Sequence, residues 1–231
     1  MISMTNGRTV FVTGGTGGLG TATVRAFLAD GWRVVAPVRP GRAGLPDGAI
    51  TVEADLNNET DVTAAMSVAA GAAEAPLRAV VNLVGAYGGT GLVADAPIEE
   101  FEGLLTRNLR PTYLVTQAAL PHLVAAGGGG IVCVSSRAAV APWPGAAGYI
   151  TAKAAVLAFA SAVAVEYKKQ HVRCNTILPS VIDTPANRRD MAGADFSKWV
   201  KPEEIAPTIL FLASDASAPT TGAQIPVYGQ S

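Results

Sequence analysis

Residues 13–20, with the sequence TGGTGGLG, join a short apolar run to a helical pattern near the amino terminus. The run at 8–13 (RTVFVT) predicts a buried strand, and the residues after the glycines, as far as Gly31, favour a helix. Five glycines among seven residues carry an entropic cost unless the geometry needs them. Glycines let a backbone turn sharply and approach a pyrophosphate, while the amino end of a helix offers free N–H groups and a positive dipole. We therefore interpret residues 13–20 as a dinucleotide-binding turn, with an ordinary flexible turn as the alternative.

Strands and helices alternate along the rest of the chain. Further strands are predicted at 33–38, 50–54, 78–83, 131–134, 172–178 and 223–227. Helices are predicted at 59–70, 149–167 and 203–213, and across 97–126 with breaks at Pro111 and Pro121. Such alternation requires crossovers and a parallel sheet covered by helices on both faces. The chain has no linker, repeat or second composition regime, so we expect residues 1–231 to form a single α/β domain.

Composition narrows the class of protein. The chain has 231 residues, 49% apolar and 15% charged, enough for a sizeable core, and its formal net charge of −1 argues against nucleic-acid binding. No stretch approaches about 20 apolar residues, and the segment up to Arg8 lacks the layout of a signal peptide, so we expect no membrane span and a cytoplasmic location. Cys133 and Cys174 lie in apolar runs and are interpreted as buried free thiols. Met1 and Met4 are alternative starts.

The end of the strand at 33–38 favours NADP(H) over NAD(H). An acidic residue at this place would bind the ribose hydroxyls of NAD. No carboxylate occurs among residues 38–42, and Arg39 and Arg42 suit a 2′-phosphate. Both arginines could instead be solvated surface residues. Asp55, just past the strand at 50–54, could contact an adenine amino group or cap the helix that follows.

Tyr149 and Lys153 form the candidate catalytic pair. They are four residues apart, so they face the same side of the predicted helix. A cation beside a phenol favours the phenolate, so we expect Lys153 to lower the pKa of Tyr149 and make it a proton donor and acceptor near neutral pH. This spacing is common by chance, and the interpretation depends on the cofactor site at the other end of the chain. His122 and His171 are isolated and no cluster has metal-ligand spacing, so we predict no metal.

Four elements resemble the short-chain dehydrogenase/reductase family over nearly the full chain. They are the glycine turn at 13–20, the turn at 82–85 (NLVG), Ser136, and the Tyr149–Lys153 pair. The separation of 13 positions between Ser136 and Tyr149 matches the family pattern and selects Ser136 over its neighbour. The resemblance implies a Rossmann-type, doubly wound fold with about seven parallel strands in the order 3-2-1-4-5-6-7.

The resemblance also implies roles for individual residues. Tyr149 would protonate a substrate carbonyl oxygen, Lys153 would lower its pKa and bind the nicotinamide ribose, and Ser136 would hold the carbonyl oxygen. Asn108 would position a water that relays protons, and Asn82 would brace the central strands. Together with the glycine turn, the resemblance assigns these cofactor-binding residues: Gly14, Thr16, Gly17, Gly18, Leu19, Gly20, Arg39, Arg42, Asp55, Leu56, Asn82, Gly85, Tyr149, Lys153, Pro179, Val181, Ile182 and Thr184.

The chain departs from the family pattern at several positions. The usual Asn-Asn-Ala-Gly turn is NLVG, the glycine common after the sixth-strand proline is Ser180, and a frequent late aspartate is Tyr228. Residues 178–199, which overlap a substrate lid expected near 183–201, are similar to dihydropteridine reductases. That group reduces a quinonoid pterin, generally favours NADH and lacks a serine at the position of Ser136.

The leading functional hypothesis is an NADP(H)-dependent carbonyl reductase or alcohol dehydrogenase (EC 1.1.1.-) acting on a small molecule. The alternatives are pterin reduction and a cofactor-binding sensor without turnover. Tyr87 and Trp143 could stack on a flat substrate or simply pack, and Met191 and Trp199 could close a lid over it. The helices at 111–126 and 149–167 carry apolar faces that form a dimer face in this family, so we expect a homodimer or homotetramer.

Overall fold

The computed structural model describes residues 7–89 and 91–230, so the alternative starts Met1 and Met4 lie outside the described residues. Seven strands form one parallel sheet in the order β3-β2-β1-β4-β5-β6-β7, as predicted. The strands are β1 (Thr9–Val12), β2 (Arg33–Val38), β3 (Ile50–Glu53), β4 (Leu77–Asn82), β5 (Gly129–Val134), β6 (Val172–Pro179) and β7 (Gln224–Val227).

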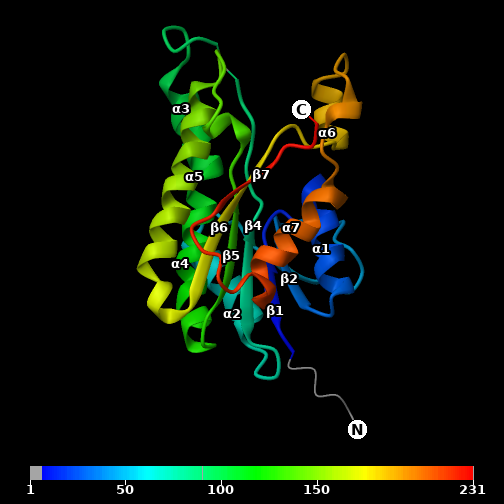
Figure 1. Ribbon diagram of the computed structural model, residues 1–231, viewed down its shortest axis with the longest axis vertical. Coiled ribbons are helices and arrows are strands. Elements are labelled where there is room, and N and C mark those ends of the chain that lie inside the picture. The colour runs from blue at the N-terminus through cyan, green and yellow to red at the C-terminus, as the bar shows by residue number, and fades with distance from the viewer. Residues whose placement is uncertain (1–6, 90, 231) are drawn as a thin grey trace.

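Helices cover both faces of this sheet. They are α1 (Gly18–Ala29), α2 (Glu59–Ala70), α3 (Ile98–Asn108), α4 (Arg110–Ala125), α5 (Ala147–Glu166), α6 (Pro185–Asp190) and α7 (Pro202–Ala213), with short 3₁₀ turns at Arg137–Ala139, Lys168–Gln170, Phe196–Lys198 and Asp215–Ser217. Figure 1 shows α3, α4 and α5 on one side of the sheet and α1 and α7 on the other. The fold is therefore a doubly wound α/β layer structure.

Two apolar cores lie on opposite faces of the sheet. One packs Phe11 and Ile131 against α2, α4 and α5, and the other packs Val10 and Val132 against α1 and α7. Consecutive strand residues thus enter different cores, as the alternation of side chains in a strand requires. Because both faces are buried, the strands read as continuous apolar runs in the sequence.

The predicted helix across 97–126 is two helices. α3 ends at Asn108 and α4 begins at Arg110, with Pro111 in its first turn, where the missing N–H is not needed. The predicted break at Pro121 is wrong, because Pro121 lies inside α4. Its side chain is on the exposed face, where water can satisfy the carbonyl group that loses its partner.

Helix α5 is long and apolar. Its most apolar 18-residue window has a mean hydropathy of 1.6, so by length and composition this 20-residue helix could cross a membrane, although the sequence predicts no membrane span. In the fold it packs on the sheet through Val156 and Ala160, and the side chain of Lys153 is buried within its inner face. One face of α5 therefore packs in the core, and 39% of its most apolar window is buried.

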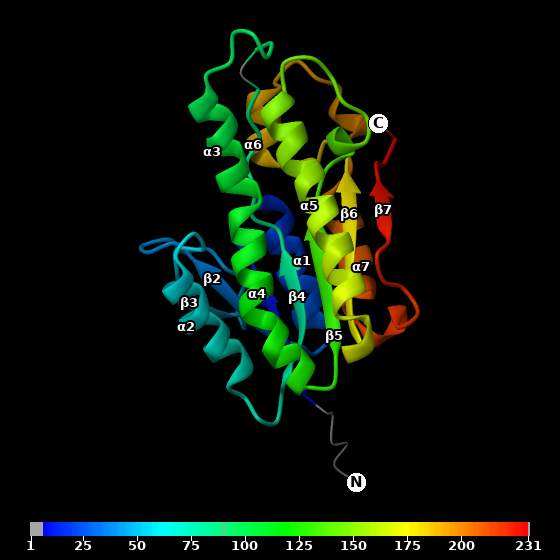
Figure 2. The ribbon, with the colours of Figure 1, turned by 90° about the vertical axis from the view of Figure 1, so that its left-hand side faces the viewer.

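All strands end at one edge of the sheet. Figure 2 shows the strand arrows of β4, β5, β6 and β7 pointing to the same end of the molecule, where α6 also lies. The segments that follow β1, β2, β4, β5 and β6 therefore meet at this carboxyl edge. In open α/β sheets this edge is where ligands bind.

Candidate active site

The glycine turn after β1 is built from close backbone approaches. Gly14 has a φ of 69°, a left-handed conformation that favours glycine, and the N–H of Gly17 donates to its carbonyl oxygen at 2.9 Å. A side chain at Gly20 would collide with the backbone of Gly14. Gly17 caps α1 without any side-chain hydrogen bond. The first N–H groups of α1 thus remain available to an anion at the turn.

A cavity of about 380 Å³, here called the glycine-turn cavity, lies along this turn. Eight of the predicted cofactor-binding residues line it: Gly14, Thr16, Gly17, Arg39, Arg42, Asp55, Leu56 and Gly85. Two guanidinium groups and a cradle that side chains would fill suit a dinucleotide with an extra phosphate. The residues present therefore fit a nicotinamide dinucleotide.

The surroundings of Arg39 and Asp55 refine two sequence-based interpretations. The N–H of Gly41 donates to Oε1 of Glu53 at 3.1 Å, so a carboxylate at the end of β3 holds the turn that carries Arg39 and Arg42. The side chain that caps α2 is Asn58, which accepts from the N–H groups of Thr60 and Asp61. Asp55 accepts from the N–H of Asn57 and faces the cavity, so it is not the helix cap.

A second cavity of about 230 Å³, the tyrosine cavity, brings together Ser136, Tyr149 and Lys153. Ser136 follows β5 and hydrogen-bonds with Tyr149, whose helix begins at Ala147, two residues earlier than predicted. Ser135 also lines this cavity, but its hydroxyl donates to the carbonyl oxygen of Lys153 at 2.7 Å. The two neighbouring serines therefore differ in their partners. The Ser135 hydroxyl bonds to the backbone of α5, and the Ser136 hydroxyl lies beside Tyr149 in the cavity.

The ionisation of Tyr149 differs from expectation. Its pKa is raised, because burial disfavours the phenolate, and the hydrogen bond with Ser136 opposes this only in part. The ammonium group of Lys153 lies 6.0 Å from the centre of the Tyr149 ring and donates to the carbonyl oxygen of Val134 at 3.1 Å. The expected lowering of the Tyr149 pKa by Lys153 is therefore not found in the chain by itself.

Burial also acts on Lys153. It lowers the pKa of the ammonium group from 10.5 to about 8, with a small opposing effect from Cys133. The side chain is 6% exposed. A lysine in this environment changes its charge close to physiological pH.

Asn108 ends α3 and is fully buried. Its Oδ1 accepts from the N–H of Ala86 at 3.1 Å, and its Nδ2 donates to the carbonyl oxygens of Ala86 and Leu104 at 2.9 Å. It therefore fastens the loop after β4 to α3. A side chain at Gly85 would come within 2.7 Å of Asn108 Oδ1 and 2.8 Å of Lys153 Nζ. Gly85 thus keeps open the space between the two.

The two cavities adjoin. Leu83, Gly85 and Ala86, in the turn after β4, line both of them. A ligand that extends along the glycine-turn cavity therefore reaches the hydroxyl groups of Ser136 and Tyr149. Of the remaining predicted cofactor residues, Leu19, Pro179 and Ile182 line the tyrosine cavity.

Five predicted cofactor residues line neither cavity, namely Gly18, Gly20, Asn82, Val181 and Thr184. Gly18 lies against Thr184, so closely that a methyl group at position 18 would collide with it. Thr184 caps α6. Asn82 ties the end of β4 to α4, because its Nδ2 donates to Thr116 Oγ1 at 3.1 Å. These five residues therefore do not line the cavities themselves.

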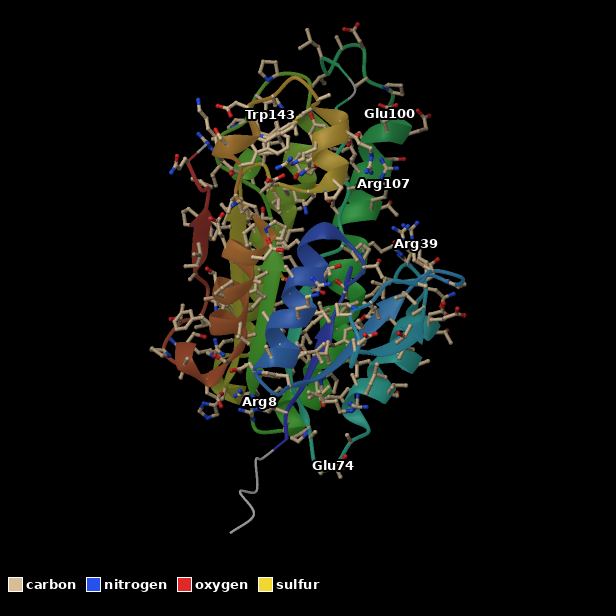
Figure 3. All side chains as sticks on the ribbon, turned by 90° about the vertical axis from the view of Figure 1, so that its right-hand side faces the viewer. Arg8, Arg39, Glu74, Glu100, Arg107 and Trp143 are labelled. Carbon is tan, nitrogen blue, oxygen red and sulfur yellow. The ribbon has the colours of Figure 1, made fainter. Side chains whose placement is uncertain are left out.

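Several residues that line the two cavities are not among the site residues predicted from the sequence. In the glycine-turn cavity they are Pro37, Val38, Ala54, Asn57, Leu83, Val84, Ala86, Arg107 and Pro111; in the tyrosine cavity they are Val134, Ser135, Ser180 and Asn187. Arg107 is the most notable, since it adds a third guanidinium group from α3, and Figure 3 shows it on the same side of the molecule as Arg39. The signal in the sequence that could have identified Arg107 is its position next to Asn108, a predicted site residue. Among residues 7–89 and 91–230, no group of His, Cys, Asp and Glu could hold a metal ion.

Comparisons with known proteins agree with this geometry. A family model described as short chain dehydrogenase matches residues 8–194. The 2-(R)-hydroxypropyl-CoM dehydrogenase of Xanthobacter autotrophicus is 30% identical over 244 residues, covering 96% of this chain and 97% of that protein. The 2,5-dichloro-2,5-cyclohexadiene-1,4-diol dehydrogenase of Sphingobium indicum is 32% identical over 243 residues, covering 96% and 95%. A short-chain type dehydrogenase/reductase from Mycobacterium ulcerans superimposes with a TM-score of 0.88 at 26% identity, covering 96% and 89%.

Proposed function

The chain belongs to the short-chain dehydrogenase family, and on that premise we propose that it is an NADP(H)-dependent carbonyl reductase or secondary-alcohol dehydrogenase. One observation carries the proposal. Ser136, Tyr149 and Lys153 line one cavity, and that cavity adjoins the glycine turn through Leu83, Gly85 and Ala86. Proton donors and a dinucleotide site thus share one cleft.

The chemistry divides between cofactor and chain. A bound nicotinamide supplies or accepts the hydride. Tyr149 holds the proton for the carbonyl oxygen, and because its pKa is raised it is a protonated phenol at neutral pH. Ser136 offers a second hydroxyl to the same oxygen, and donors placed in advance stabilise the charge that develops there. Lys153, with a pKa of about 8, can return a proton to Tyr149 after transfer.

The preference for NADP(H) rests on charge. Arg39, Arg42 and Arg107 line the glycine-turn cavity, and Asp55 is the one acidic residue among its lining residues. An excess of guanidinium groups favours the more highly charged dinucleotide. Glu53 holds the Arg39–Arg42 turn through the N–H of Gly41 and leaves both side chains to face the cavity.

The test is a ketone-dependent oxidation of NADPH, compared between the wild-type chain and Tyr149→Phe. We expect Tyr149→Phe to bind NADPH with nearly unchanged affinity, measured by fluorescence titration, and to lose turnover by about 100-fold or more. Turnover near the wild-type rate in this variant would contradict the assignment of the acid. Absence of NADPH binding by the wild-type chain would contradict the proposed enzyme as a whole.

Pterin reduction is the second candidate, favoured by the likeness of residues 178–199 to dihydropteridine reductases. It predicts rapid NADH oxidation with a quinonoid dihydropterin and little dependence on Ser136. Activity on ketones with NADPH and none with the pterin would exclude it. A sensor without turnover is less consistent with the chain, since Tyr149 and Lys153 are both present.

We also propose a homodimer or homotetramer formed through the outer faces of α4 and α5. Tyr113 on α4 and Val165 on α5 are exposed apolar side chains, 47% and 78% exposed. Ala158 and Ala162 lie exposed between them on α5, so a second helix pair could approach closely. Light scattering of the purified chain tests this, with Val165→Glu expected to lower the mass and a monomeric wild type contradicting it.

A further inference from the structure

The tyrosine cavity contains one aromatic side chain besides Tyr149. Tyr87, on the loop after β4, lies with its ring centre 5.1 Å from that of Tyr149 at an interplanar angle of 73°, an edge-to-face contact. Tyr87 is nevertheless 66% exposed, and its hydroxyl makes no hydrogen bond within the described part of the chain. A large ring is thus held beside the catalytic phenol with most of its surface uncovered.

The cavity offers little to a charged ligand. Lys153 is the only charged residue among its lining residues, and its ammonium group donates to the carbonyl oxygen of Val134. Three other polar side chains also donate to backbone carbonyl oxygens: Ser135 to Lys153, Ser180 to Tyr228, and Asn187 to Ile182. The polar groups that remain for a ligand are chiefly the hydroxyls of Tyr149, Ser136 and Tyr87.

Two arginines next to residues that line the cavity, Arg188 and Arg137, are engaged within the protein. Arg188 forms an ion pair with Asp183 through two contacts and lies 4.8 Å over the ring of Phe196. Arg137, next to Ser136, lies 5.1 Å over the ring of Tyr228. An acidic substrate would have to break one of these contacts or draw the Lys153 ammonium group away from the carbonyl oxygen of Val134, and both cost free energy.

Exposed apolar side chains lie on the loops at the carboxyl edge of the sheet, where the tyrosine cavity also lies. They come from the loops that follow β4, β5 and β6 at the carboxyl edge, and they are Tyr87, Leu92, Val93, Val140, Trp143 and Met191. Figure 3 shows Trp143 at this end of the molecule. A group of exposed apolar side chains near a cavity is typical of a site for an apolar ligand.

We propose that the tyrosine cavity is a subsite for an uncharged ketone with a flat ring beside its carbonyl group. The ring packs against Tyr87 while the carbonyl oxygen meets Tyr149 and Ser136. Aromatic pairs gain about 0.5–1.5 kcal/mol beyond the burial of area, which corresponds to roughly 2- to 12-fold in affinity. The inference rests on the proposed function and names its substrate class.

The experiment measures binding apart from turnover. Three ketones are titrated by calorimetry into the chain saturated with NADP⁺, which cannot reduce them: acetophenone, cyclohexyl methyl ketone as its non-planar match, and 4-acetylbenzoate as its charged match. The variants are Tyr87→Leu, which removes the ring, and Tyr87→Phe, which keeps it. Phe211→Leu is the control, because Phe211 is an exposed aromatic residue on α7 that lines neither cavity.

We expect acetophenone to bind most tightly and 4-acetylbenzoate at least about tenfold more weakly. Tyr87→Leu should weaken acetophenone about 3- to 10-fold and cyclohexyl methyl ketone less than about twofold, while Tyr87→Phe and Phe211→Leu stay within about twofold for both. Equal affinity for the charged ketone, equal losses for the two neutral ketones, or no loss in Tyr87→Leu would overturn the proposal.

A parallel assay separates the two levels of the proposal. The same ketones are mixed with the wild-type chain and NADPH, and oxidation of NADPH is followed. Ring-selective binding without any oxidation would overturn the reductase and leave the subsite standing. Oxidation with ketones but no ring selectivity would leave the reductase standing and overturn the subsite.

Discussion

The hydroxyl of Ser180 donates a 2.6 Å hydrogen bond to the backbone carbonyl oxygen of Tyr228. Both positions depart from the family's common residues, a glycine and an aspartate, and the structure connects them. The bond joins the end of β6 to the end of β7, and the ring of Tyr228 lies beneath Arg137, the residue after Ser136. The carboxyl-terminal segment is thereby fastened to two walls of the tyrosine cavity.

We predict that Ser180→Gly lowers the free energy of unfolding by about 1–2 kcal/mol, through the lost hydrogen bond and the added freedom of glycine. Ser180→Ala removes the hydroxyl alone and should lower it by about 1 kcal/mol. Urea denaturation of both variants measures the two contributions. Wild-type stability in both would mean that the contact contributes nothing to folding.

Lys153→Met should stabilise the fold at neutral pH while removing activity. The pKa of Lys153 is about 8 in the folded chain against 10.5 ordinarily, so burial of the charge costs roughly 3 kcal/mol below pH 8. This cost declines between pH 8 and 10.5, where the unfolded chain binds more protons, and disappears above. The stability gain of the variant should therefore fall to zero across that window.

Urea denaturation of the wild-type chain and of Lys153→Met at pH 7, 8, 9 and 10 measures this difference. Taking the difference cancels the titration of groups common to both proteins. A variant less stable than wild type at pH 7 would show that the contact of Lys153 with Val134 outweighs the burial of charge.

Arg39→Asp should shift the cofactor preference towards NADH. A charge-assisted contact to a phosphate contributes about 1.5–3 kcal/mol, so the affinity for NADPH should fall roughly 10- to 100-fold. NADH affinity should change little, because its ribose carries hydroxyls that a carboxylate can bind. Arg25→Asp, on the exposed face of α1 and outside both cavities, is the control. An unchanged NADPH to NADH ratio in Arg39→Asp would rule out this arginine as the selector.

Gly85→Ala should impair catalysis through the neighbours of Gly85. Its backbone is not in the left-handed region, so alanine is acceptable to the main chain, and the added carbon instead meets Asn108 Oδ1 and Lys153 Nζ. Displacing the ammonium group should lower kcat about 10- to 100-fold and move the pH profile of kcat.

Gly88→Ala is the matched control for Gly85→Ala, since in the same loop its added carbon meets a flexible end of Leu104 at 3.0 Å. We expect it to keep its kcat within about twofold and its pH profile unchanged. Equal losses in the two variants would indicate a general effect on the loop rather than on Lys153.

The sheet could be predicted because its signals are local. β2 and α2 were predicted at their observed bounds, since apolar runs bounded by turn residues specify both. The direction of Lys153 towards Val134 could not be predicted, because it depends on contacts between segments far apart in sequence. The helix break predicted at Pro121 is wrong for a related reason. Pro121 lies on the exposed face of α4, where a proline is tolerated, and exposure depends on the tertiary structure.

For the candidate site too, features with a local sequence pattern were predicted, and features that depend on contacts between distant segments were not. The family pattern of 13 positions between Ser136 and Tyr149 was needed to choose Ser136, because Ser135 lines the tyrosine cavity as well and the sequence alone does not separate the two. Arg107 was missed because a single arginine in a helical pattern is ordinarily solvent-facing. Only the packing of α3 over the turn after β4 turns that position towards the glycine-turn cavity.

The contact between Gly18 and Thr184 has a kinetic consequence. The start of α1 and the start of α6 touch there with no room for a methyl group, so the glycine turn and the segment that begins at Thr184 are in direct contact. We propose that residues 183–201 move as a lid, so that NADP⁺ leaves only when this contact opens. We expect the dissociation rate of NADP⁺, rather than hydride transfer, to set the maximal turnover number.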